Sequence, residues 1–208
     1  NMTNVDELLQ QLYELGQHPK EKADTVTVLE KIGHFLDTEV QGLFDQYKRE
    51  GLDDNMEISK LIANDMDVAK ILKKSAKNWD GGYTIAGIFG HGDAFIMRDP
   101  SGIRPAYYFY NDEVVVAASE RPALQTAFNI PIDEIKEIQP GHALIVKKNG
   151  DVDEHQFSEP LEKKACSFER IYFSRGSDSA IYRERKQLGR LLCPQILNAV
   201  GHDVKNTV

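Results

Sequence analysis

The chain has 208 residues, of which 41% are hydrophobic, and it carries a formal net charge of −8 at pH 7. This hydrophobic content is sufficient for a folded core, whereas the acidic charge argues against a nucleic-acid-binding surface. No run approaches the ~18 consecutive apolar residues of a membrane-spanning helix. The two cysteines lack CxxC spacing, so neither a disulfide framework nor a structural zinc site is expected, and a reducing, cytoplasmic compartment is predicted.

The first 80 residues are predicted to be helical. Thr3 or Asn4 is positioned to cap a first helix, with Asp6 or Glu7 as the acid of a capping box. Apolar residues then recur at i, i+3 and i+4 as far as Leu15.

Two further helices follow in this half of the chain. The second is expected to begin at Asp24 and to have an apolar face as far as Leu36; the same spacing extends to Tyr47, which allows the helix to continue that far. Residues 51–55 form a predicted turn, and residues 58–72 a third helix.

From Gly81 the apolar period changes from 3.6 to 2, which is typical of strands. The runs are short, rich in β-branched or aromatic residues, and bounded by turn residues. Their close spacing predicts antiparallel hairpins, because parallel strands need long crossover connections. The predicted strands are residues 83–89, 94–97, 106–110, 114–118, 142–147 and 171–174.

Two helices are expected among and after these strands. Residues 119–128 form the first, which Ser119 and Glu120 are placed to cap. Residues 181–200 form the second, at the end of the chain. The elements together predict an α+β fold with helices packed on antiparallel sheets.

Generic catalytic motifs are absent, since the sequence contains no GxxxxGK[ST] phosphate loop, no HExxH and no GxSxG. The three glycines of residues 87–92 are explained by a strand and its hairpin turn. The six histidines show no metal-ligand spacing. Cys166 and Cys193 are predicted to be buried, inert thiols.

Several segments, in chain order, are similar to motifs of the glutamine phosphoribosylpyrophosphate amidotransferase family. Residues 98–105 (RDPSGIRP) resemble its RDPxGIRP loop, and residues 116–120 (VAASE) resemble its VASE strand end. Residues 139–143 (QPGHA) are similar to its PG turn, and residues 166–178 (CSFERIYFSRGSD) to its cysteine-FE and YFxR strand. Residues 1–4 (NMTN) match the end of its HNGNxTN motif.

The resemblance implies a fold of the N-terminal-nucleophile hydrolase type. This is a four-layer α/β/β/α sandwich of antiparallel sheets, of which the chain would hold a part together with an N-terminal helical segment. Its expected parts are a helical portion of the glutaminase domain (1–36), a helical decoration (37–80), the sheet portion of that domain (81–178) and a helix leading toward a phosphoribosyltransferase domain (179–208).

The same resemblance implies an activity. Enzymes of this family release ammonia from glutamine and transfer it to phosphoribosylpyrophosphate in de novo purine biosynthesis. Their cysteine nucleophile, its α-amino base and the Asn-Gly oxyanion hole would lie upstream of Asn1. We therefore expect the chain to be a fragment of such an enzyme that is inactive by itself.

Asp24 is the residue expected to contact the substrate. It follows the family's pattern of an acid that pairs with the α-amino group of glutamine, a charge-assisted bond that selects the free amino acid. The alternative is that Asp24 only caps the helix that begins there, and both roles can hold at once.

The loop residues Arg98, Asp99, Gly102 and Arg104 are expected to support the pocket rather than to catalyse. In this interpretation Asp99 accepts hydrogen bonds from loop N–H groups, and an arginine pairs with a carboxylate.

Ser119 and Glu120 would lie close to the glutamine pocket, by the same resemblance. Cys166 matches a cysteine that ligates an iron–sulfur cluster in some branches of the family, but the other ligands would lie outside this chain, so no cofactor is expected here. Mg²⁺ would accompany the phosphoribosyltransferase domain. The expected partners are glutamine, that domain and a second copy of the chain, with neither nucleic acid nor a membrane; the second copy would pair with an open edge strand, at residues 83–89 or 94–97.

Two other interpretations stay open. Another class II amidotransferase, such as glucosamine-phosphate synthase or asparagine synthetase, shares the RDxxG and SE elements, although the YFxR and PxGIRP segments favour the purine enzyme. The other is a non-catalytic module that uses the same fold to bind a partner or to regulate.

Overall fold

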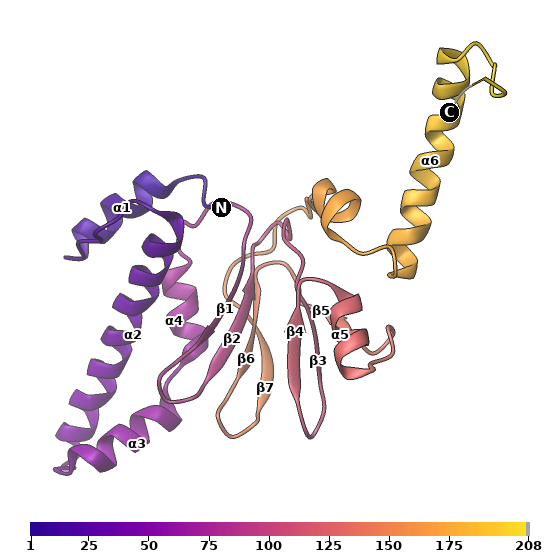
Figure 1. Ribbon diagram of the computed structural model, residues 1–208. Helices are drawn as coiled ribbons and strands as arrows, with labels where there is room; N and C mark the ends of the chain where they lie inside the picture. The colour runs from indigo at the N-terminus through magenta and orange to yellow at the C-terminus, as the bar shows by residue number, and fades with distance from the viewer. Residues whose placement is uncertain (207–208) are drawn as a thin grey trace. The chain divides into compact units, whose positions relative to one another are not determined.

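The computed structural model describes residues 1–206, which form two compact units (Figure 1). The first unit contains Asn1–Ala106 and Glu137–Ala165, and the second contains Tyr107–Lys136 and the chain from Cys166 onward. Each unit combines helices with antiparallel strands, so the predicted α+β class is confirmed. Within residues 1–206, no helix is long and apolar enough to cross a membrane.

The helical half of the first unit matches the apolar periodicity, with one exception. Its helices are α1 (Val5–Glu14), α2 (Asp24–Arg49), α3 (Asn55–Asp65) and α4 (Val68–Ser75). The prediction of one helix over residues 58–72 was wrong, because Met66 leaves the helical conformation with ψ near 123°. The side chain of Asp67 accepts the N–H of Lys70 at 2.9 Å and so caps a new helix.

The predicted capping box at the start of α1 was also wrong. Asn4 does occupy the N-cap position, but its side chain accepts no hydrogen bond from the helix backbone. Its amide instead donates to Glu7 Oε2 at 3.3 Å and to the carbonyl of Asn78 at 2.8 Å. Asn4 therefore ties the start of α1 to the segment that follows α4.

A four-stranded antiparallel sheet forms the rest of the first unit. Its strands are β1 (Thr84–Ile88), β2 (Ala94–Arg98), β6 (His142–Val146) and β7 (Val152–Gln156), in the order β1-β2-β6-β7. The sequence did not predict β7, because VDEHQ is a mostly polar strand. The strand β1 lies at one edge of this sheet, so one of its sides has no neighbouring strand.

The helices α2 and α4 lie on one face of this sheet, as Figure 1 shows. The residues that alternate toward this face share one core with the helices. Leu8, Ile58, Leu72 and Met97 are fully buried in it. This core fixes the start of α2 opposite the strand β1 and so positions the site described below.

The second unit contains a three-stranded sheet and three helical elements. They are β3 (Tyr107–Tyr110), β4 (Val115–Ala118), β5 (Lys136–Glu137), α5 (Arg121–Phe128), the π-helix η1 (Glu169–Phe173) and α6 (Ser179–Ala199). The predicted strand 171–174 was wrong, because these residues belong to the π-helix and its end. The predicted cap of α5 was wrong too: Glu120 is at the N-cap position but makes no side-chain cap hydrogen bond.

An ion pair joins α5 to the start of α6. Arg121 donates from Nε and Nη2 to the two carboxylate oxygens of Asp178, both at 2.8 Å. Asp178 is buried, and its Oδ1 also accepts the N–H groups of Ala180 and Ile181. One carboxylate therefore caps α6 and attaches it to α5.

Candidate functional site

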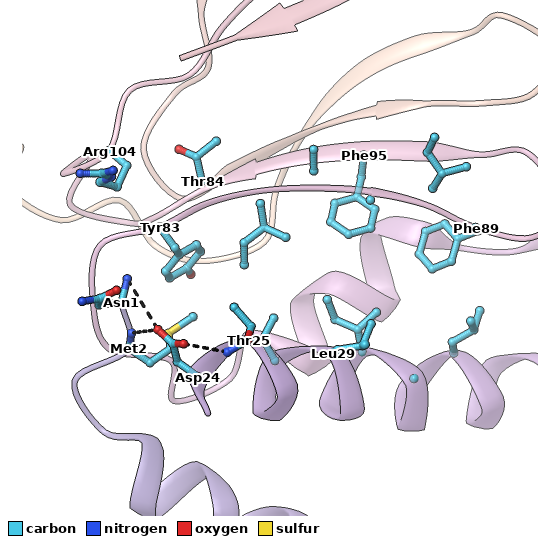
Figure 2. A pocket seen from close by; sticks show the side chains of 18 of the residues that line it. Asn1, Met2, Asp24, Thr25, Leu29, Tyr83, Thr84, Phe89, Phe95 and Arg104 are labelled. Carbon is cyan, nitrogen blue, oxygen red and sulfur yellow. Dashed lines mark hydrogen bonds and ion pairs between the residues drawn. The ribbon is translucent and has the colours of Figure 1, made fainter. Parts of the chain in front are cut away.

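A cavity of about 700 Å³ lies between the first half of α2 and the strand β1 (Figure 2). Its charged side chains are Asp24, at the start of α2, and Arg104, from the loop after β2. Most of the wall is apolar and includes Val28, Leu29, Ile32, Tyr83, Phe89 and Phe95. The cavity therefore combines a single carboxylate with a hydrophobic wall.

Asp24 lies at the mouth of this cavity with about a third of its side chain exposed. Its Oδ1 accepts the N–H of Thr25 at 2.9 Å, and its Oδ2 accepts the N–H of Met2 at 3.4 Å. The α-ammonium group of Asn1 lies 4.0 Å from the same Oδ2. Asp24 thus places a carboxyl group, held by two backbone N–H groups, at the cavity.

The N-terminal residues lie along the segment that leads into β1. The ammonium group of Asn1 donates to the carbonyl of Gly82 at 2.9 Å, and Met2 forms an isolated β-bridge with Gly81. Gly81 has φ near +140°, and a Cβ atom on it would lie 2.1 Å from the carbonyl oxygen of Asn1. Only glycine allows this close approach of the two segments.

Gly87 and Phe95 form the far wall of the cavity. They face each other in the register of β1 and β2, and a Cβ atom on Gly87 would lie 2.5 Å from the Phe95 ring. The ring centroid of Phe89 is 5.5 Å from that of Phe95. A strand and its hairpin turn were expected at Gly87, but its contact with Phe95 was not, because it depends on the register between β1 and β2.

Tyr83 lines the cavity on the side of Asn1 and Asp24 (Figure 2) and is 6% exposed. Its hydroxyl has no hydrogen-bond partner among residues 1–206. Burial, and then the charge of Asp99, raise the pKa of this hydroxyl above its usual range. The phenol therefore stays protonated over the whole physiological range and offers a hydrogen-bond donor beside the cavity.

The loop that carries Arg104 is held by the buried carboxylate of Asp99. This side chain is fully buried and accepts the N–H groups of Tyr83 at 3.3 Å, Ile103 at 2.9 Å and Arg104 at 3.0 Å. Gly102 provides the turn with φ near +57°. The structural role expected for Asp99 is therefore what the geometry shows.

Arg98 fixes the other side of the same loop. It is 2% exposed, and it donates to the carbonyls of Arg104, Gly102 and Ile138 at 2.7, 3.1 and 2.7 Å. It also pairs with Glu137 at 2.8 Å. Burial raises the pKa of Glu137, but hydrogen bonds and charges from Lys163 and Arg98 outweigh it and leave that pKa lowered. The expected pairing of an arginine with a carboxylate is thus present.

The remaining residues singled out in the sequence lie in the second unit. Ser119 follows the end of β4 and Glu120 precedes α5, with Glu120 Oε2 3.7 Å from Arg175 Nε. Cys166 is half-buried and Cys193 is exposed, so the prediction of a buried thiol was wrong for Cys193. Within residues 1–206 no group of histidine, cysteine or acidic residues could hold a metal ion.

The chain is similar in sequence to several known proteins. No protein-family model matches the chain. A curated relative from Pasteurella multocida, an amidophosphoribosyltransferase, is 27% identical over 206 residues that cover 94% of this chain and 36% of that protein. The Bacillus subtilis amidophosphoribosyltransferase is 27% identical over 98% of this chain and 36% of its own length. The enzyme of Synechocystis is 30% identical over 68% of this chain.

Solved structures agree with these sequences. The glutamine phosphoribosylpyrophosphate amidotransferase of B. subtilis, complexed with ADP and GMP, matches 84% of this chain with a TM-score of 0.54 and 25% identity. An allosteric regulatory enzyme of purine biosynthesis matches the same share with a TM-score of 0.55. The chain is a relative of the amidophosphoribosyltransferases. It spans about a third of the length of the amidophosphoribosyltransferases that it matches.

Proposed function

We propose that the chain is part of an amidophosphoribosyltransferase and forms the glutamine-binding portion of its glutaminase site. In this proposal the site releases ammonia from glutamine, and a phosphoribosyltransferase domain uses the ammonia in de novo purine biosynthesis. The observation that carries the proposal is Asp24, a fixed carboxylate at the mouth of a cavity whose wall is otherwise mostly apolar.

The geometry supports recognition of a free amino acid. Asp24 lines the cavity, and the backbone N–H groups of Thr25 and Met2 hold its carboxyl group in place. The α-ammonium of glutamine would pair with the same carboxylate, and its methylene groups would contact the apolar wall. Glutamine within a peptide lacks that charge and would be excluded.

We further propose that the chain by itself binds glutamine without cleaving it. Among the described residues that line the cavity, none is a cysteine or a serine. The hydroxyl of Thr84, which does line it, already donates to the carbonyl of Pro105 at 3.1 Å. Release of ammonia from glutamine by the chain alone, lost in Asp24→Ala, would contradict this part of the proposal.

The binding proposal predicts a large effect of one substitution. Asp24→Asn is expected to weaken L-glutamine binding about 10- to 100-fold, because a hydrogen bond to a charged group contributes ~1.5–3 kcal/mol. Isothermal titration calorimetry of the chain measures this difference. N-acetyl-L-glutamine, which lacks the α-ammonium group, should bind the unsubstituted chain as weakly as glutamine binds Asp24→Asn.

Asp37→Asn is the matched control, since Asp37 is an exposed carboxylate on the same helix. It should leave glutamine binding unchanged. If Asp24→Asn binds glutamine as well as the unsubstituted chain and only lowers the urea midpoint, Asp24 is a helix-start residue and has no part in recognition.

We also propose that the chain associates with a second copy through β1. This strand has an open edge, and Ile88 on it is 80% exposed while Leu29 on the neighbouring α2 is 69% exposed. Open edges of this kind pair readily with other strands. Light scattering at high concentration should give the mass of a dimer or larger species. Ile88→Lys should shift it toward the monomer, whereas Met56→Lys, at a position on α3 that is 70% exposed, should not.

The proposed phosphoribosyltransferase domain, to which Mg²⁺ would belong, has a candidate contact surface on α6. Large apolar side chains are exposed along this helix, at Leu188, Leu191, Leu192 and Ile196. Apolar residues exposed at helical spacing usually mark a face that another folded element covers. Two free cysteines fit the proposed cytoplasmic location.

A further inference from the structure

A second cavity of about 600 Å³ lies beside α4 and the end of β7, away from Asp24 in the first unit. We call it the lysine hollow. Four of its lining residues are lysines, and none of those that the structure describes is acidic. The lysines are Lys70, Lys73, Lys74 and Lys77.

Lys70, Lys73 and Lys74 share one face of α4, because their spacing is i, i+3 and i+4. Lys77 follows the end of α4 and lines the same cavity. All four are exposed. The sequence from Val68 to Trp79 contains no aspartate or glutamate, although the whole chain has a net charge of −8. The positive charge is therefore concentrated at this place.

Most of this positive charge has no carboxylate to balance it. Lys70 pairs with Glu39 at 2.6 Å, but within residues 1–206 no acidic side chain pairs with Lys73, Lys74 or Lys77. Lysines in the last turn of a helix interact favourably with the helix dipole, which gives a structural reason for Lys73 and Lys74. That effect fades beyond the last turn and gives no reason for Lys77.

A buried lysine beside the lysine hollow adds to the imbalance. Lys31 is 3% exposed, and its ammonium group donates to Gln11 Oε1 at 3.0 Å and to the carbonyl of Lys77 at 2.6 Å. Neither acceptor carries a charge. Burial, and then the charge of Lys77, lower the pKa of Lys31 to about 8. Positive charge at this corner is thus costly, and a bound anion would offset that cost.

The floor of the lysine hollow is apolar. Trp79 and Phe157 line it and are 8% and 5% exposed. An apolar floor lowers the local dielectric constant and strengthens the attraction between the lysines and an anion. The indole N–H of Trp79 also has no hydrogen-bond acceptor among the described residues.

We propose that the lysine hollow binds a small ligand that carries two or more phosphate groups. Flexible ammonium groups act as point charges that suit phosphate oxygens. The three lysines on α4 span about 6 Å along the helix axis, and Lys77 extends the positive charge beyond the end of that helix, so the four charges cover more than a single phosphate group can contact. A ligand with one negative charge would leave most of this positive charge unbalanced. This site is separate from the cavity at Asp24 and does not depend on its function.

Titration of sodium tripolyphosphate into the full chain tests the proposal by calorimetry. Binding is expected at low ionic strength and should weaken as NaCl is added. Lys73→Gln/Lys77→Gln should weaken it at least tenfold. The matched control is Lys20→Gln/Lys60→Gln, which removes the same charge from two exposed lysines elsewhere and should change the affinity less than twofold. Circular dichroism of both double variants checks that they are folded.

Three results would overturn the proposal. The first is no binding of tripolyphosphate to the unsubstituted chain. The second is an equal loss in the two double variants, which would indicate a general effect of net charge. The third is binding of duplex DNA as tight as that of tripolyphosphate, which would assign the lysines to a macromolecular polyanion. Inorganic phosphate should bind at least tenfold more weakly than tripolyphosphate, and equal affinity would contradict a ligand with several phosphate groups.

Discussion

Replacing Arg98 with alanine is expected to lower the free energy of unfolding by about 3–5 kcal/mol, the usual cost of removing one partner from a buried charged network. The guanidinium group is buried and donates to three carbonyl groups and to Glu137. In Arg98→Ala these acceptors lose their donor inside the protein, and a cavity replaces the side chain. Such a loss is a large part of a typical stability of ~5–15 kcal/mol.

Urea denaturation followed by circular dichroism measures this effect. Arg98→Lys keeps the charge but cannot reproduce the planar set of donors, so it should fall between alanine and the original residue. Arg49→Ala is the control, because Arg49 is exposed and should cost less than about 0.5 kcal/mol. A loss below 1 kcal/mol in Arg98→Ala would show that the loop of residues 99–104 is held by other contacts.

Replacement of Asp93 is the second change expected to lower the free energy of unfolding strongly, because this side chain connects separate segments of the first unit. Its side chain is 1% exposed, and its Oδ2 lies 2.5 Å from Lys147 Nζ and 3.0 Å from His91 Nε2. Its Oδ1 accepts the N–H of Lys148 at 2.8 Å, and Lys147 also donates to the carbonyl of Met66. Asp93→Ala is expected to cost about 3 kcal/mol, since it leaves buried donors without their charged acceptor.

The contribution of Asp93 should also depend on pH. Burial raises the pKa of Asp93, but hydrogen bonds from Lys147, His91 and Lys148 outweigh it and lower that pKa below its usual value. The stabilisation is then complete above the unfolded-state pKa of about 4 and is lost as the pH falls through the lowered folded-state pKa. Urea midpoints of the original chain and Asp93→Asn should therefore converge at acid pH. A constant difference between pH 7 and pH 3 would contradict this.

The sequence predicted the long helices well, because a long apolar periodicity indicates both that a helix forms and which of its faces is buried. The face of α2 continues through Leu43 and Tyr47, and the helix is continuous to Arg49. The break between α3 and α4 was missed because Ile62, Met66 and Ala69, at i, i+4 and i+7, keep the apolar periodicity across it. Its signal is polar: Asp67 is a good N-cap residue.

The π-helix η1 shows why a short apolar run is ambiguous. Ile171 and Tyr172 favour a strand by type, yet their side chains are 59% and 74% exposed, so no sheet buries them. Hydrogen bonds from α6 hold the segment instead, since Arg185 donates to the carbonyls of Arg170 and Ser174. These partners are distant in sequence, and no local pattern predicts them.

The sequence allowed the charged residues of the candidate site to be predicted, but not the apolar wall of its cavity. Asp24 was identified from the resemblance, and the loop at Arg98 and Asp99 from its motif. The apolar wall depends on the register that places Gly87 against Phe95, and on the bridge between Met2 and Gly81. Both are contacts between segments, which residue types alone do not determine.

The ion pair between Arg121 and Asp178 affects how far the end of α6 can move. This helix has 21 residues, which corresponds to a length of about 30 Å. Its described hydrogen bonds to other elements are made by residues 178–185, and the side chains from Lys186 to Ala199 are exposed or half-exposed. The helix is therefore attached to the rest of its unit at its N-terminal end only, as far as the described hydrogen bonds show. A tilt of about 10° at Asp178 would move its far end by about 5 Å, given that length, so small changes in one ion pair are amplified along the helix.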